Sequence, residues 1–100
     1  MNKIKEVIEH MDDTLDEIQA YYEDYLMYCD TDKKLAQSLL DVGIIHLSIY
    51  EKLHSAVVEI INTHKREKGD IPKEMQVIYE YEHKRVAKRF NELKHKMERL

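Results

Sequence analysis

The chain has 100 residues, of which 36% are charged, and carries a formal net charge of −4 with two glycines, one proline and one cysteine. This length allows one domain with a modest core, residues 1–100, and the scarcity of glycine and proline favours a few long helices over a sheet with many turns. The lone cysteine excludes an internal disulfide, and the chain has neither an apolar run of about 18 residues nor a signal-peptide pattern, so we expect a cytoplasmic protein with no membrane segment.

The first expected helix covers residues 2–29. Its apolar residues recur at alternating spacings of four and three, the pattern of a helix in a bundle, and no charged residue falls among them. These residues are Ile4, Ile8, Met11, Leu15, Ile18, Tyr22, Tyr25 and Cys29. In the turn that follows, Thr31 or Asp32 is suited to cap the next helix.

The second expected helix, residues 33–68, is the longest and the most apolar. Between Leu35 and Ile61 its apolar side chains cover roughly 200–260° of the circumference, whereas a helix that packs against one neighbour needs a stripe of about 100°. Gly69 marks the end of this helix, because glycine is favoured just beyond a helix C-terminus. We therefore expect this helix to be covered on several sides.

The third expected helix, residues 72–100, begins at Pro72. Three long helices with short connections predict an all-α, up-down-up antiparallel bundle. Two neighbours do not cover the second helix fully, so we expect homo-oligomerisation to complete the bundle, with tyrosines at the end of the first helix projecting beyond the third. The expected interface residues are Tyr22, Tyr25, Tyr28, Ile44 and Leu47.

The charges are distributed unevenly along the chain. Residues 1–32 are mainly acidic, whereas residues 83–100 are mainly basic. Because the first and third helices lie side by side in an up-down-up bundle, these two faces are expected to neutralise each other. This argues against nucleic acid as a partner of the basic helix.

Polar side chains inside the apolar stripes are the candidate functional residues. His46, Tyr50 and His54 are spaced four apart and form a column on one face of the second helix. On the third helix, Glu82 occupies the stripe position that follows Tyr79. We therefore expect a buried carboxylate, which must be protonated, paired or bound to a metal.

A metal site is one interpretation of these residues. The pattern Glu-x-x-His occurs three times, at residues 51–54, 80–83 and 92–95. Ferritin-like di-iron bundles use such pairs on facing helices, which supports iron or another transition metal as an alternative. The first helix, however, offers no inward glutamate. The candidate metal ligands are Glu51, His54, Glu80, Glu82 and His83.

A purely structural polar cluster is the second interpretation. Glu82 then pairs with Arg85 one turn away or with His54 across the helix interface. Glu51 is nearly level with Arg89, which predicts an ion pair between helices.

A pocket for a small anionic ligand, such as a nucleotide, is the third interpretation, because tyrosine and histidine stack on bases and arginine binds phosphate. The candidate ligand-binding residues are His46, Tyr50, His54, Tyr79, His83, Arg85 and Arg89. The chain shows no glycine-rich phosphate loop and no recognisable catalytic triad. We therefore expect a non-enzymatic helical protein without a cofactor, which self-associates and binds a protein partner or sequesters a small ligand between subunits.

Overall fold

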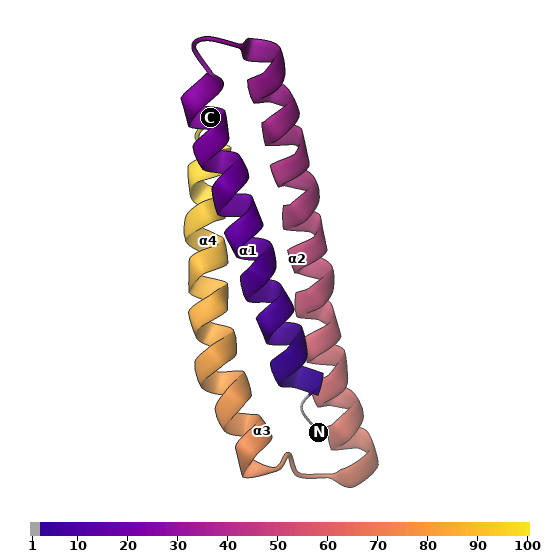
Figure 1. Cartoon of the computed structure of the whole chain (residues 1–100). Helices are drawn as coiled ribbons and strands as arrows, with labels where there is room; N and C mark the ends of the chain where they lie inside the picture. Colours follow the sequence, from indigo (N-terminus) through magenta and orange to yellow (C-terminus); the bar gives the residue numbers. More distant parts are fainter. Residues whose placement is uncertain (1–2) are drawn as a thin grey trace.

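The computed structural model describes residues 3–100, which form three helical segments and no strand (Figure 1). The all-α prediction is therefore confirmed for this part of the chain. The elements are α1 (Lys3–Tyr28), α2 (Lys33–Lys68), α3 (Lys73–Val77), the π-helical turn η1 (Ile78–His83) and α4 (Lys84–Glu98). The last three follow one another without a break, and together they form the third helix.

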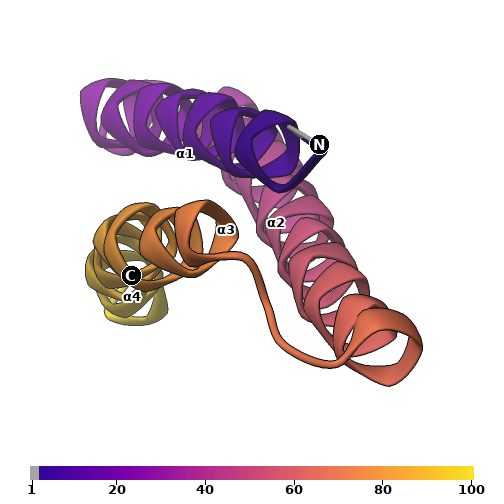
Figure 2. The ribbon, with the colours of Figure 1, turned by 90° about the horizontal axis from the view of Figure 1, so that it is seen from below.

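The three segments run up, down and up, and they form a rod with extents of 56 × 20 × 18 Å (Figure 1). α1 packs against α2 on one side and against η1 and α4 on the other. Toward its C-terminal end, α2 diverges from α3, as the view along the rod shows (Figure 2). No helix within residues 3–100 combines the length and the apolar character needed to cross a membrane.

The core stripe of α1 follows the predicted spacing over most of its length. Its buried members are Ile4, Ile8, Met11, Leu15 and Ile18. Farther along, Tyr22, Tyr25 and Cys29 are only half-buried. The stripe is therefore buried in the core over about four turns and becomes accessible near the first connection.

Both ends of α2 carry the expected capping residues. The Asp32 carboxylate accepts a hydrogen bond of 3.1 Å from the backbone N–H of Leu35, which satisfies one of the free donors of the first turn. At the other end Gly69 has a φ of 81° and its N–H donates to the carbonyl of Lys65 at 3.0 Å. A left-handed φ of this kind favours glycine, because a Cβ would meet the backbone.

The buried side of α2 is narrower than its composition suggests. Ala36, Gly43, Tyr50 and Val57 are buried at a strict spacing of seven. Other apolar residues of this helix remain in solvent, with Ile44, Ile45 and Ile49 exposed by 50%, 59% and 40%. The single chain therefore covers only part of the apolar circumference of α2.

The third helix buries Val86, Phe90, Leu93 and Met97, but the predicted burial of Glu82 is wrong. The side chain of Glu82 is 52% exposed, whereas His83 is buried. Consecutive helical residues point about 100° apart, so these two lie on either side of the inner face. His83 faces α2, whereas Glu82 lines a groove beside α1.

Candidate functional site

A row of rings joins α2 to the third helix, and we call it the aromatic seam. Its members are Tyr50 and His54 from α2, Tyr79 and His83 from η1, and Phe90 from α4. Tyr50 stacks on Phe90 with ring centroids 4.0 Å apart and planes 10° apart. His83 stacks on Tyr79 at 5.0 Å and meets the edge of His54 at 4.8 Å. Large rings thus fill the space where these two helices approach each other.

Helical spacing explains how these rings come together. Tyr50 and His54 are four residues apart on α2, and Tyr79 and His83 are four apart on the third helix, so each pair shares one face. The second pair lies in η1, a π-helical turn, in which backbone hydrogen bonds join residues five apart instead of four. Turns of this kind are rare and occur frequently at functional sites.

Two polar atoms of the seam are buried without a hydrogen-bond partner. They are Oη of Tyr50 and Nε2 of His83, in residues that are only 2% and 8% exposed. Buried polar groups in folded proteins are nearly always paired, and leaving one unpaired costs about 1–3 kcal/mol. The seam therefore carries an unsatisfied hydrogen-bonding capacity that a bound molecule would satisfy.

Burial also sets the charge state of these two groups. It raises the pKa of Tyr50 to about 12, because a phenolate is poorly solvated there. Burial lowers the pKa of His83 from its ordinary 6.5, and the nearby imidazole of His54 lowers this pKa further. Both groups are consequently neutral at pH 7, so Tyr50 has a hydroxyl donor and His83 has one donor and one acceptor nitrogen.

A cleft opens beside the seam, and we call it the α2–η1 cleft. Its volume is about 720 Å³, and Val58 and Ile61 of α2, Ile71 of the connection and Tyr79 of η1 contribute to its lining. Val58 also lines a second groove of about 470 Å³ that contains Tyr50 and His54. Small-molecule sites are typically concave regions of about 300–1,000 Å³ with a few polar groups, so this space is large enough for a ligand.

The rim of the cleft and groove is predominantly acidic. Its carboxylates are Glu51, Glu59, Asp70 and Glu80, and its cation is Lys65. Glu51 lies 3.7 Å from the ammonium of Lys94, and this contact replaces the ion pair predicted between Glu51 and Arg89. An acidic rim attracts cations, repels anions and does not discriminate against neutral molecules.

The structure brings together four of the seven predicted ligand-binding residues, namely Tyr50, His54, Tyr79 and His83. His46 lies on the other side of α2, where its Nε2 is 2.6 Å from the carboxylate of Glu17 on α1. The column predicted for His46, Tyr50 and His54 is thus divided, because α1 and the third helix pack against different sides of α2.

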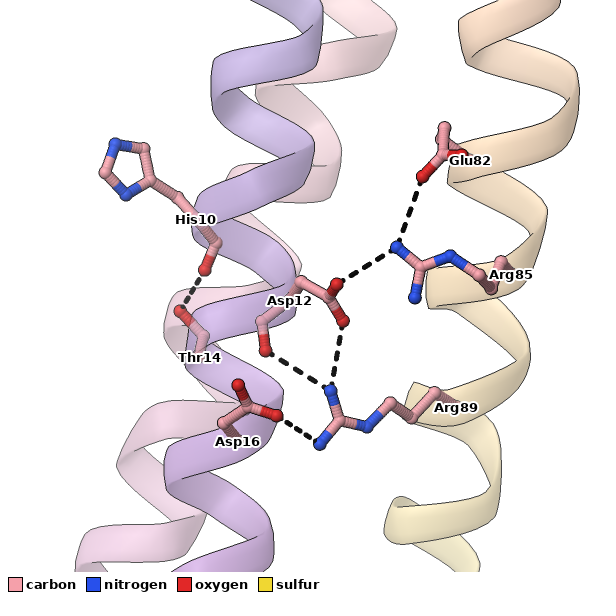
Figure 3. A network of polar contacts seen from close by, with 7 residues as sticks. All are labelled: His10, Asp12, Thr14, Asp16, Glu82, Arg85 and Arg89. Atoms are coloured by element: carbon pink, nitrogen blue, oxygen red, sulfur yellow. Dashed lines mark hydrogen bonds and ion pairs between the residues drawn. The ribbon is translucent and has the colours of Figure 1, made fainter.

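Arg85 and Arg89 face α1 instead of the seam (Figure 3). Arg85 donates to Asp12 at 3.0 Å and to Glu82 at 3.2 Å, which is the pairing predicted for Glu82. Arg89 donates to Asp12 at 3.0 Å and to Asp16 at 2.6 Å. The hydrogen bond from the Arg85 guanidinium, with a further one from Arg89, holds the pKa of Asp12 below its ordinary value. The basic third helix is thus paired with the acidic first helix, as predicted.

The predicted metal ligands do not gather at one point. Among residues 3–100, no group of three or more His, Cys, Asp or Glu side chains is placed to hold a metal ion. Of the five predicted ligands, only His54 and His83 are adjacent. Glu80 accepts from Gln76 at 3.2 Å, and the other two glutamates contact basic side chains.

The predicted interface residues differ in their exposure. Tyr22, Tyr25 and Tyr28 are half-buried, and Leu47 packs against the core, whereas Ile44 is exposed. Sequence reasoning missed Ile45 and Ile49, although both lie on the side of α2 away from the seven-residue buried repeat. That repeat is the signal in the sequence that identifies the outer face.

No family model matches the chain, and no curated protein or solved structure is similar enough to it to count as a match. Function must therefore be inferred from the chemistry of the site.

Proposed function

We propose that this protein is a non-enzymatic binding protein that takes a small planar ligand in the α2–η1 cleft, against the aromatic seam. The observation that supports this most directly is the pair of unpartnered buried atoms, Oη of Tyr50 and Nε2 of His83. A ligand whose ring stacks on Tyr79, which lines the cleft, would reach Oη of Tyr50 through the adjoining groove that Tyr50 lines, and would reach Nε2 of His83 when the rings of the seam move apart.

The proposed ligand is neutral or cationic. The sequence favours an anionic ligand, but the arginines expected to bind it, Arg85 and Arg89, are paired with carboxylates of α1. The rim of the cleft has Lys65 as its cation and more carboxylates than cations. A phosphate at this rim would meet repulsion from these carboxylates, and the guanidinium of Arg66 is already 3.9 Å from one of them, Glu59.

The adjacent imidazoles of His54 and His83 favour a second candidate, a transition-metal site. Two histidines supply half of a tetrahedral ligand set, so ligands from outside the chain would have to complete it. In that case zinc raises the melting temperature of the wild type, and His54→Leu abolishes the rise. If zinc leaves the melting temperature unchanged, this candidate is rejected.

We also propose that the protein self-associates, because isoleucines on α2 are exposed by up to 59%. A cytoplasmic location is part of the same proposal and agrees with Cys29 being a free thiol.

Three probes of matched shape test the ligand site. Benzamidine is cationic, benzamide is neutral and benzoate is anionic, and each is titrated into the isotope-labelled protein while NMR follows the imidazole signals of His54 and His83. We expect benzamidine and benzamide to shift these signals, with benzoate binding about tenfold more weakly. Benzoate binding most tightly, or no shift at the seam with any probe, would refute the proposal.

Variants that keep the rings make the test specific. Tyr50→Phe removes only the unpartnered oxygen, and His83→Phe keeps an aromatic ring while removing both imidazole nitrogens, so we expect both proteins to fold and to bind the two favoured probes more weakly. His95→Phe is the matched control, because His95 is exposed on α4. Equal affinities for all three variants and the wild type would show that the unpartnered atoms do not contact the ligand.

A further inference from the structure

The side of α2 that faces away from the core forms a continuous exposed surface, which we call the outer strip. Its members are Lys34, Asp41, Ile45, Ser48, Ile49, Lys52 and Glu59, all exposed. The buried residues of α2 repeat every seven positions, so residues about half a turn away point into solvent. α1 and the third helix both lie on the core side of α2, away from the outer strip (Figure 2).

The charges of the outer strip are complementary to those of a second, antiparallel copy of the same strip. Lys34 and Glu59 are equally far from the midpoint between His46 and Leu47, and their charges are opposite. The same holds for Asp41 and Lys52 about the same midpoint. A second copy of α2 that runs antiparallel about a two-fold axis at this midpoint therefore meets an opposite charge at each of the four positions.

The apolar residues of the strip fit the same axis. Ile45 and Ile49 lie within one residue of being symmetric about it, so Ile45 of one copy lies near Ile49 of the partner subunit. These two side chains are exposed by 59% and 40% in the single chain, and Ile44 on the flank is exposed by 50%. Covering them removes apolar surface from water at the centre of the contact, with charged residues on both sides.

A parallel arrangement fails the same comparison. In a parallel pair, Asp41 would face Asp41 of the partner subunit and Lys52 would face Lys52 of the partner subunit, so every charged contact would be repulsive. The two lysines of the strip form no ion pair within residues 3–100, so they are free to contact a second copy. Within α2, Glu59 lies 3.9 Å from Arg66 and Asp41 accepts from Gln37 at 2.9 Å.

From this pattern we propose that a second copy of the chain packs antiparallel along the outer strip of α2, with Lys34 against Glu59 of the partner subunit and Asp41 against Lys52 of the partner subunit. This inference rests on the self-association proposed above and adds its surface, orientation and register. The contact is isologous, so it closes as a dimer and does not propagate into a filament.

Charge exchange tests the register. Sedimentation equilibrium of the wild type is expected to show a dimer of the 12.1 kDa chain. Asp41→Lys and Lys52→Asp each place like charges together twice per dimer, so each raises the dimer Kd about tenfold or more. The double variant Asp41→Lys/Lys52→Asp restores opposite charges at both positions and returns the Kd to near the wild-type value.

Asp13→Lys is the matched control, because Asp13 is exposed on α1 and the same charge change is made away from the strip. It is expected to leave the Kd unchanged, and far-UV circular dichroism checks that every variant is helical. A wild type that stays monomeric at high micromolar concentration overturns both self-association and this inference. A wild-type dimer that the single variants do not weaken, or that the double variant does not restore, overturns only the proposed surface and register.

Discussion

Removing the hydroxyl of Tyr50 is expected to stabilise the protein. The ring of Tyr50 is 2% exposed and stacks on Phe90 at 4.0 Å, and Tyr50→Phe keeps both the ring and the stack. It deletes an oxygen that is buried without a partner, which relieves about 1–3 kcal/mol of desolvation cost. The small void left by that oxygen destabilises the protein by up to about 1 kcal/mol and so offsets part of this gain. We therefore expect a net stabilisation of about 1 kcal/mol, or a rise in melting temperature of about 4–8 °C.

Urea unfolding followed by circular dichroism measures this change, at one fixed protein concentration because self-association affects apparent stability. The urea midpoint should rise while the m-value stays constant. Tyr25→Phe is the control, since Tyr25 is half-buried outside the seam, and it should change the free energy of unfolding by less than about 0.5 kcal/mol. A Tyr50→Phe protein that is less stable than the wild type would show that this hydroxyl is already satisfied, and the main support for the ligand site would be lost.

Three further predictions concern the rest of the bundle. Burial lowers the pKa of His83, so as the pH falls the unfolded chain takes up a proton at this imidazole before the folded chain does. The stability that comes from keeping His83 neutral is complete above about pH 6.5 and is lost below it, so His83→Phe should flatten the decline in urea midpoint between about pH 7 and pH 5. An unchanged decline would contradict the lowered pKa of His83. Asp12→Asn weakens ion pairs with two arginines and should destabilise the protein by about 1 kcal/mol at low salt, allowing for solvent screening. The control Asp13→Asn should have almost no effect. Equal losses of unfolding free energy in the two variants would show that these ion pairs contribute nothing specific. Gly43→Ala gains helix propensity of about 1 kcal/mol and places its Cβ 3.1 Å from the terminal methyl of Met97. Because this methyl is at the end of a flexible side chain and can shift, thermal unfolding should show a small stabilisation. A fall in melting temperature would mean that the methyl cannot move.

Features that depend on one helix at a time could be predicted from the sequence. Asp32 caps α2 and Gly69 ends it as expected, because capping depends on residues within one turn. The buried stripe of α1 follows a periodicity that is visible along the chain itself. The pairing of the acidic first helix with the basic third helix also follows from charge and chain order, although its members Asp12 and Asp16 could not be singled out.

Other features depended on where neighbouring helices lie, and only the tertiary structure decided them. Glu82 and His83 lie on either side of the same inner face, so periodicity does not show which of the two is buried. The position of α2 determines that His83 is buried and Glu82 is exposed. The composition of α2 shows that it is apolar around most of its surface, but the packing of α1 and the third helix determines that Ile45 and Ile49 stay in solvent. The physical reason is that helical periodicity records the direction of each side chain around its own axis, whereas burial depends on which directions the other helices occupy.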